Sequence, residues 1–172
     1  DQLIVTPQVV RLRPGESVRL TVTAMSRSGV LTPVEEAHWS VEEGIATLNS
    51  DGLLFAGDKP GFYKNAIKVT VTAGNGEEQI TRTASANVII LGPLARVEIV
   101  PRQVELSPKQ VVQFTYIAFD VNDIRLFNVS GTWGVLDEVA GSINNIGLFI
   151  AGETPGQYGD VIKDTVRPLS RY

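Results

Sequence analysis

The sequence predicts an all-β fold of two tandem β-sandwich domains, and three observations support this prediction. Apolar residues recur at every second position, the same pattern occurs twice along the chain, and turns rich in Gly, Pro and Asn separate the short apolar runs. Such alternation places one face of each strand in a core and the other in water, as two packed sheets require. A chain of 172 residues is long enough for two cores.

The internal repeat defines the organisation of the chain. A shift of 94 residues aligns "TPQVVRLRPGESVRLTVTA" at residues 6–24 with "VPRQVELSPKQVVQFTYIA" at residues 100–118, and it places Trp39 on Trp133. Matched Gly, Pro and Trp positions in the same order do not arise by chance. We expect each Trp to be the central aromatic residue of one core.

One residue is inserted after the Trp, and the shift becomes 95 residues. It then aligns "GLLFAGDKPGFYKNAIKVTV" at residues 52–71 with "GLFIAGETPGQYGDVIKDTV" at residues 147–166. The two repeats meet at "LGPLARV", where Gly and Pro interrupt the strand pattern. We therefore expect one domain at residues 1–91 and a second at residues 92–172.

Two strands show the alternation most clearly in each repeat. Ile67, Val69 and Val71 alternate with polar residues in the first domain, and Ala73 continues the pattern. The other strand has matched inward faces in both domains, namely Val18, Leu20, Val22 and Ala24, and Val112, Phe114, Tyr116 and Ala118. Turn sequences "PGES", "NSDG", "AGDKPG" and "AGNGEE" separate the strands of the first domain.

The second domain lacks the last strand that the first domain has. Residues 79–91 alternate as a final strand in the first domain, but the second repeat reaches residue 172 at the position of the preceding turn. Its penultimate strand also differs, because Asp164 replaces Val69 and Pro168 interrupts the pattern. We therefore predict a C-terminally incomplete second sandwich with an open edge.

An open edge exposes apolar core surface and unpaired backbone groups. Two occupants would cover it: a second copy of the chain, giving a homodimer through the open edge, or residues outside this sequence. A solvated edge is the alternative to both.

Composition excludes several classes of protein. The chain has no Cys, so disulfides, thiolate metal sites and Cys nucleophiles are excluded. The net charge of −4 is spread over both repeats, and neither offers the basic face that nucleic acid needs. No apolar run approaches the roughly 20 residues of a membrane-spanning helix, so we expect no membrane insertion and no cofactor.

The repeat resembles a known family through the order "LxPG", an alternating strand, a Trp strand, "GLxxAG", "PGxY" and "IKVTV". It is similar to bacterial Ig-like (Big) domains of group 2, found in tandem in surface proteins of the intimin and invasin type. The resemblance implies immunoglobulin-like sandwiches without a disulfide and a cell-surface or secreted bacterial protein. It also implies adhesion or spacing, and it supplies no catalytic residues.

Residues with catalytic potential are few. His38 is the only histidine, which excludes the usual zinc sites, and its parity places it opposite Trp39. Acidic residues flank the Trp strand in both domains, where they are typical of solvated loops. These are Glu35, Glu36, Glu42 and Glu43 in the first domain and Asp137 and Glu138 in the second. We assign no catalytic residue and predict that the chain is not an enzyme.

Two binding hypotheses remain open at this level. Asp120, Asn122 and Asp123 in "FDVNDI" offer oxygen ligands for calcium, although Asx residues in a bend more often bind their own backbone. Ile117 and Phe119 lie opposite the inward face of their strand and form a candidate binding patch, unless loops cover them.

The leading functional hypothesis is a non-catalytic structural or adhesive module that binds a protein or spaces other domains. The alternative is a carbohydrate-binding module of a secreted enzyme, which needs exposed aromatic rings for stacking. With both Trp residues assigned to cores, Phe62, Tyr63 and Tyr158 remain available for that role. The sequence does not name the ligand.

Overall fold

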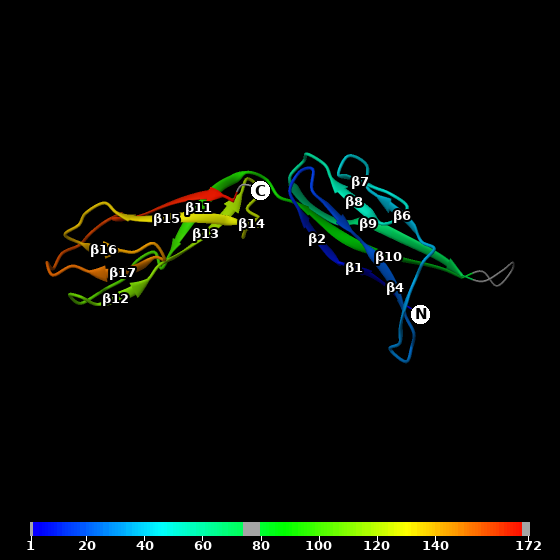
Figure 1. Ribbon diagram of the computed structural model, residues 1–172, viewed down its shortest axis with the longest axis horizontal. Coiled ribbons are helices and arrows are strands. Elements are labelled where there is room, and N and C mark those ends of the chain that lie inside the picture. Colours follow the sequence, from blue (N-terminus) through cyan, green and yellow to red (C-terminus); the bar gives the residue numbers. More distant parts are fainter. Residues whose placement is uncertain (1, 74–79, 170–172) are drawn as a thin grey trace. The chain divides into compact units, whose positions relative to one another are not determined.

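The computed structural model describes residues 2–73 and 80–169, and every element in these ranges is a β-strand (Figure 1). The chain divides into two compact units, Asp1–Gly92 and Pro93–Tyr172, one residue from the expected boundary. The turn predicted at "AGNGEE" falls mostly on residues 74–78, outside the described residues. The described residues contain no helix with the length and hydropathy needed to cross a membrane.

Unit 1 contains ten strands in two layers. One layer combines the sheets β1-β4-β5 and β3-β8-β7, in which β3 and β4 are two halves of one strand that breaks at Leu20. The facing layer has the order β2, β10, β9, β6, and β2 is parallel to β10. The bounds are β1 (Gln2–Thr6), β2 (Val9–Leu12), β3 (Ser17–Arg19), β4 (Thr21–Met25), β5 (Leu31–Pro33), β6 (His38–Val41), β7 (Ala46–Leu48), β8 (Leu53–Ala56), β9 (Gly61–Ala73) and β10 (Ile80–Ile90).

This strand order defines an immunoglobulin-like sandwich. The first strand is split into β1 and β2, which lie in opposite layers. Strands β6, β9 and β10 form one sheet with β2, and the remaining strands form the other layer. The prediction that the first domain has an all-β, immunoglobulin-like fold is therefore confirmed.

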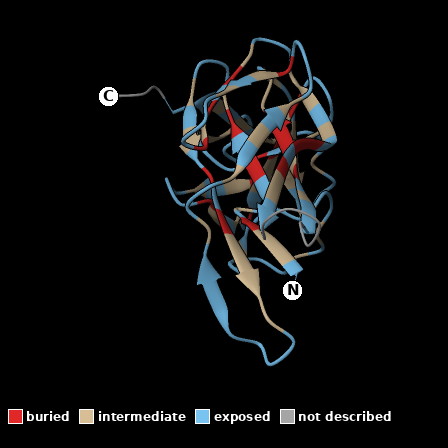
Figure 2. Cartoon of the chain, turned by 90° about the vertical axis from the view of Figure 1, so that its right-hand side faces the viewer, coloured by how far each residue is buried: buried red, intermediate tan, exposed pale blue. Residues whose placement is uncertain are grey.

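The core of unit 1 follows the predicted alternation, and most of its buried residues lie on strands (Figure 2). Leu20 and Val22 are buried, as are Ile67 and Val69. One departure is Ala66, which the alternation places outside but which is 3% exposed. Asn65 has φ 53°, and the pairing of β9 with β10 shifts register nearby, so a bulge turns Ala66 inward.

A Gly-containing turn holds the Trp of each unit. Gly52 has φ 76°, and a Cβ there would stand 2.6 Å from the Leu20 carbonyl oxygen and 3.4 Å from the Trp39 ring. Gly147 occupies the matching position in unit 2, with φ 82° and the Trp133 ring 2.9 Å away. Only glycine combines this backbone conformation with so close an approach.

Unit 2 repeats this architecture with fewer strands. Its three sheets have the orders β11-β13-β14, β12-β17-β16 and β15-β18. The bounds are β11 (Leu94–Val100), β12 (Val111–Gln113), β13 (Thr115–Asp120), β14 (Arg125–Leu126), β15 (Val129–Val135), β16 (Gly141–Ile143), β17 (Leu148–Ala151) and β18 (Ile162–Pro168). Within the described residues it has no counterpart of β10, as predicted.

Candidate functional site

The site that distinguishes unit 2 from unit 1 is the unpaired edge of β18, which we call the open edge. In unit 1, β9 pairs with β6 on one side and with β10 on the other. Its counterpart β18 pairs, within residues 80–169, with β15 alone. Residues 103–106, which match β2, form no strand there. In unit 1 the matching residues form β2, which pairs with β10.

The open edge leaves apolar side chains less buried than their matches. Val10 and Leu12 are 1% and 7% exposed in unit 1, whereas their counterparts Val104 and Leu106 are half-buried. The same holds for two further matched pairs, Val5 with Ile99 and Ile67 with Ile162. Of the buried apolar residues in the described chain, 15 lie in unit 1 and 5 in unit 2. Unit 2 therefore has the smaller core, which leaves it less stabilised by burial.

A row of cationic side chains follows the outer face of β18. Lys163, Thr165 and Arg167 are all exposed on this face. They stand opposite Gly134, Thr132 and Ser130 of β15, so no acidic residue faces them across that pair. The matching row of unit 1 is Lys68, Thr70 and Thr72, and the second cation is therefore particular to unit 2.

The inner face of β18 carries the unusual Asp164, opposite Trp133. Both carboxylate oxygens are buried, and neither has a hydrogen-bond partner in the described part of the chain. Space for them comes from Gly131, because a Cβ there would stand 2.6 Å from Asp164 Oδ1 and 2.5 Å from the Tyr116 ring. Burial raises the pKa of Asp164. The backbone N–H groups of Thr132 and Thr165 lie near the carboxylate and oppose that rise, although neither makes a hydrogen bond of normal geometry to it.

This group of three residues replaces an apolar group in unit 1. Val69 stands where unit 2 has Asp164, while the matches of Gly131 and Tyr116 are Ala37 and Val22. The substitutions compensate one another in volume, but they leave a carboxylate without a partner inside unit 2.

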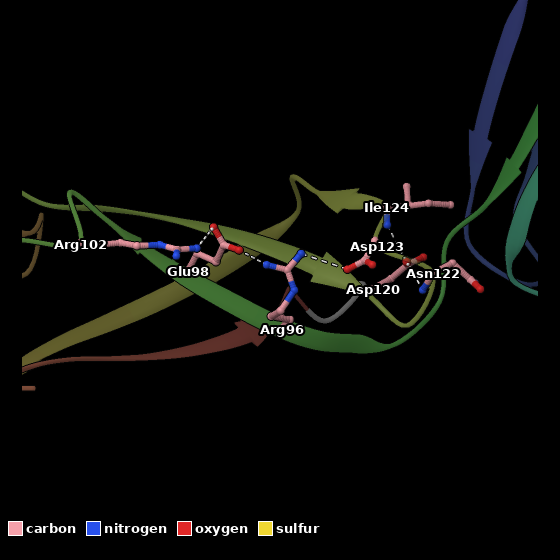
Figure 3. A network of polar contacts seen from close by, with 7 residues as sticks. All are labelled: Arg96, Glu98, Arg102, Asp120, Asn122, Asp123 and Ile124. Carbon is pink, nitrogen blue, oxygen red and sulfur yellow. Dashed lines mark hydrogen bonds and ion pairs between the residues drawn. The ribbon is translucent and has the colours of Figure 1, made fainter.

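The three calcium candidates lie in the hairpin between β13 and β14 (Figure 3). Asp120 is 2% exposed, and its Oδ1 accepts hydrogen bonds from the backbone N–H groups of Asn122 at 2.8 Å and Ile124 at 2.9 Å. Asp123 has φ 58° and pairs with Arg96 at 3.0 Å. Asp120 therefore stabilises its own turn. Among the described residues, no cluster of three His, Asp or Glu side chains could hold a metal ion.

Asp123 belongs to a chain of ion pairs along β11 (Figure 3). Arg96 contacts both Asp123 and Glu98, and Glu98 also pairs with Arg102 at 3.1 Å. The hydrogen bond with Asp123 and the charge of Glu98 raise the pKa of Arg96, which remains a cation. The pairs are largely exposed, so their contribution to stability is small.

The predicted patch of Ile117 and Phe119 is not an exposed surface. Both side chains are half-buried, and the Arg96 guanidinium lies 4.1 Å from the centre of the Phe119 ring. The strand pairing also places Arg125 opposite Phe119. Phe119 is therefore covered in part by Arg96, while the role of Ile117 and Phe119 in binding stays a prediction.

Ile117 also lines a cavity of about 320 Å³ in unit 2. Aromatic residues of β13 and β15 line it, and the rings of Tyr116 and Trp133 lie 5.9 Å apart. Phe127, at its mouth, is 65% exposed and packs under Arg125. The lining includes Phe114, Tyr116, Ile117, Arg125, Phe127 and Trp133.

The tyrosines proposed as sugar-stacking residues have a structural role. The Tyr63 hydroxyl donates a hydrogen bond to the Lys59 carbonyl at 2.9 Å, and the Tyr158 hydroxyl donates one to the Thr154 carbonyl at 2.8 Å. Each lies at the corner before β9 or β18, which is the tyrosine corner of immunoglobulin-like sandwiches. The repeated "PGxY" is the signal for this corner. Of the three candidates, Phe62 alone is exposed, at 55%.

The remaining candidates lie apart from one another. Trp39 packs against the core of unit 1 and Trp133 against Phe114 and Tyr116, and both are half-buried rather than fully buried. His38 is exposed. Within the described residues, no acidic residue that flanks a Trp strand forms a contact with His38.

Comparisons with known proteins give distant likenesses. No family model matches the chain, and no curated protein matches it. Among solved structures, it is similar to human protocadherin-24 EC1-2 (10% identity, TM-score 0.31), covering 96% of this chain and 92% of that one.

Two further structures extend over nearly all of this chain. One is the Yersinia pseudotuberculosis adhesin InvE (12% identity, TM-score 0.30), with coverage of 99% of this chain and 58% of the adhesin. The other is the protocadherin gammaB7 EC3-6 cis-dimer (14% identity, TM-score 0.29), with coverage of 98% and 47%. The chain thus spans about half the length of these two proteins. Because all three TM-scores are below 0.5, the fold assignment depends on the strand order.

Proposed function

We propose that the chain is a non-catalytic adhesive or spacing module of a bacterial surface or secreted protein, built from two bacterial Ig-like domains of group 2. The observation that supports this function is that both units repeat one scaffold residue by residue. The Gly–Trp turn and the tyrosine corner occur in both units, whereas β18 and the residues that face it differ from their matches in unit 1. A repeated scaffold with one specialised surface suits presentation and binding.

The polar residues of unit 2 fit this function, because they are engaged in holding the fold. Asp120 closes its own turn, and Arg96 packs on Phe119 while pairing with acidic neighbours. The carbohydrate-binding alternative retains a single exposed ring, Phe62, since both corner tyrosines use their hydroxyls internally. One isolated ring is a small stacking platform.

Surface display tests the proposal. A non-adherent laboratory bacterium that displays the chain should be retained under flow on protein-coated surfaces, compared with cells that display the empty anchor. A labelled chain should give no specific signal on a glycan array. Retention equal to that of the empty anchor contradicts adhesion, and a specific glycan signal abolished by Phe62→Ala favours the alternative.

A further inference from the structure

The cavity of unit 2 lies beside the Trp of that unit, and we call it the Trp133 cavity. All of its lining residues fall between Phe114 and Ile146, on β13, β14, β15 and the turn before β17. The rings of Phe114 and Tyr116 lie 6.5 Å and 5.9 Å from the Trp133 ring. A cavity of roughly 150 Å³ holds one benzene ring. A volume of about 320 Å³ therefore accepts one aromatic or long aliphatic side chain.

Unit 1 has different residues at the matching place. Leu20 and Val22 stand where unit 2 has Phe114 and Tyr116, so the aromatic lining is particular to unit 2. The rim differs as well, because three apolar residues of unit 2 match polar residues of unit 1. These pairs are Ile117 with Thr23, Val129 with Glu35 and Ile146 with Asp51. Unit 2 therefore surrounds the cavity with apolar side chains that the scaffold itself does not require.

The turn that carries Ile146 shows this most clearly. The Asn144 Oδ1 atom accepts a hydrogen bond from the backbone N–H of Ile146 at 3.1 Å. In unit 1, the Asn49 Oδ1 atom accepts the same bond from Asp51, also at 3.1 Å. The same turn thus presents a carboxylate in unit 1 and an apolar side chain, 66% exposed, in unit 2. Together with Phe127, which is 65% exposed, it forms exposed apolar surface around a hollow, as binding sites do.

The charge of the rim also differs between the units. Arg125 is the one charged side chain among the described residues that line the Trp133 cavity, and its guanidinium lies 4.9 Å from the centre of the Phe127 ring. Unit 1 has Leu31 at that position, and it has Glu35 and Asp51 where unit 2 has apolar residues. The rim charge is therefore +1 in unit 2 and −2 in unit 1. A cationic rim attracts an acidic ligand and disfavours a basic one.

We propose that the Trp133 cavity binds a partner polypeptide through one aromatic or long aliphatic side chain that has acidic neighbours in the partner's sequence. The inserted side chain contacts the aromatic lining, and the carboxylates lie near Arg125. A ligand that only fills the cavity leaves Phe127 and Ile146 exposed, whereas a polypeptide that continues on either side of the inserted residue covers both. Such a central anchor with a surrounding rim is typical of protein–protein interfaces.

The proposal names the partner chemistry of the adhesive function proposed above, and it rests on that function in one respect, that the chain acts by binding a protein. The two fail separately. A chain that binds the acidic peptide described below but is not retained under flow contradicts adhesion alone. Retention that is unchanged by Ile146→Asp contradicts the Trp133 cavity alone.

The test titrates the ¹⁵N-labelled chain with short peptides and follows the NMR signals of the protein. Each unit has one Trp, so the indole N–H signals of Trp39 and Trp133 report on the two units separately. The acidic peptide has a central Phe with Asp on both sides, and the basic peptide has Lys in place of each Asp. A third peptide keeps the Asp residues and has Ser in place of the Phe.

We expect the acidic peptide to shift the Trp133 indole and Ile146 amide signals in a saturable manner, while the Trp39 signal stays in place. The basic peptide should bind about fivefold more weakly, because exposed charge pairs contribute little free energy. The third peptide should cause no shift, because it has no side chain to fill the cavity.

Protein variants locate the interaction. Ile146→Asp should weaken binding of the acidic peptide about tenfold, through lost apolar contact and added repulsion. Its fold is expected to persist because Asp51 occupies the same turn in unit 1, and circular dichroism checks this. Arg125→Glu should reverse the preference between acidic and basic peptides. Asp51→Ile is the matched control in unit 1 and should leave peptide binding unchanged.

Four results would overturn the proposal. The first is an unmoved Trp133 signal at millimolar concentrations of the acidic peptide. The second is peptide binding that neither Ile146→Asp nor Arg125→Glu alters. The third is binding of 3-phenylpropionate as tight as that of the acidic peptide, which would assign the cavity to small carboxylates. The fourth is a concentration-dependent dimer, seen by sedimentation, that Ile146→Asp abolishes, which would assign it to a second copy.

Discussion

Replacing Asp164 by Val should stabilise unit 2. The two carboxylate oxygens are buried and without partners, and such a group costs about 1–3 kcal/mol. Because the residue as a whole is half-buried, we expect a gain at the lower end, about 1–2 kcal/mol. For a domain of this size, each kcal/mol corresponds to a rise of about 4–8 °C in Tm.

The same residue predicts a pH dependence whose sign is fixed by its raised pKa. Between the ordinary value of 3.8 and the raised folded value, the folded unit holds a proton that the unfolded chain has lost. The contribution of this group to the stability of unit 2 is therefore fully present below pH 3.8. It is lost as the pH rises from 3.8 through the raised pKa of the folded state. Asp164→Asn should remove this dependence.

Thermal unfolding followed by circular dichroism measures both effects, and hydrogen exchange with mass spectrometry assigns each transition to its unit. The matched variant Val69→Asp in unit 1 should cost about 3 kcal/mol or more, because Val69 is fully buried and Ala37 stands where Gly131 makes room in unit 2. An Asp164→Val variant no more stable than the wild type, with the pH profile intact in Asp164→Asn, would refute the reasoning.

Three further predictions concern features shared by the units. Gly52→Ala and Gly147→Ala should each cost about 1–3 kcal/mol, since a Cβ would stand within 2.6 Å of a backbone oxygen at positive φ; an unchanged Tm would contradict the turn geometry. Tyr63→Phe and Tyr158→Phe should each cost about 1 kcal/mol in urea unfolding through loss of the corner hydrogen bond, and a neutral effect in both would remove the corner's role. Asp120→Ala should destabilise unit 2 by about 1–2 kcal/mol in the absence of calcium; a loss that appears only with calcium present would instead support the metal hypothesis.

The sequence was sufficient to predict the fold because the pattern is local and occurs twice. Alternation identified the inward faces, and the matched Trp and Gly positions identified the same turn in both units. The burial of Ala66 could not be predicted, because the bulge at Asn65 shifts the alternation by one residue.

The candidate sites were predicted less well, because they depend on contacts between strands. Ile117 and Phe119 have the parity of exposed residues, and only the pairing of β11 with β13 reveals that Arg96 packs on Phe119. Likewise, the role of Tyr63 depends on a hydrogen bond across its own corner. The alternation places Lys163 and Arg167 on one face of β18, whereas the pairing of β18 with β15 alone, within the described residues, is seen only in the structure.

Amide hydrogen exchange, compared between β9 and β18, tests the one-sided pairing of β18 most directly. The central residues of β9 lie between two paired strands, whereas β18 is paired on one side within the described residues. We predict strong protection along residues 66–71 and markedly faster exchange at residues 162–167. Equal protection in the two strands of the free chain, at concentrations where sedimentation shows a monomer, would contradict the open edge.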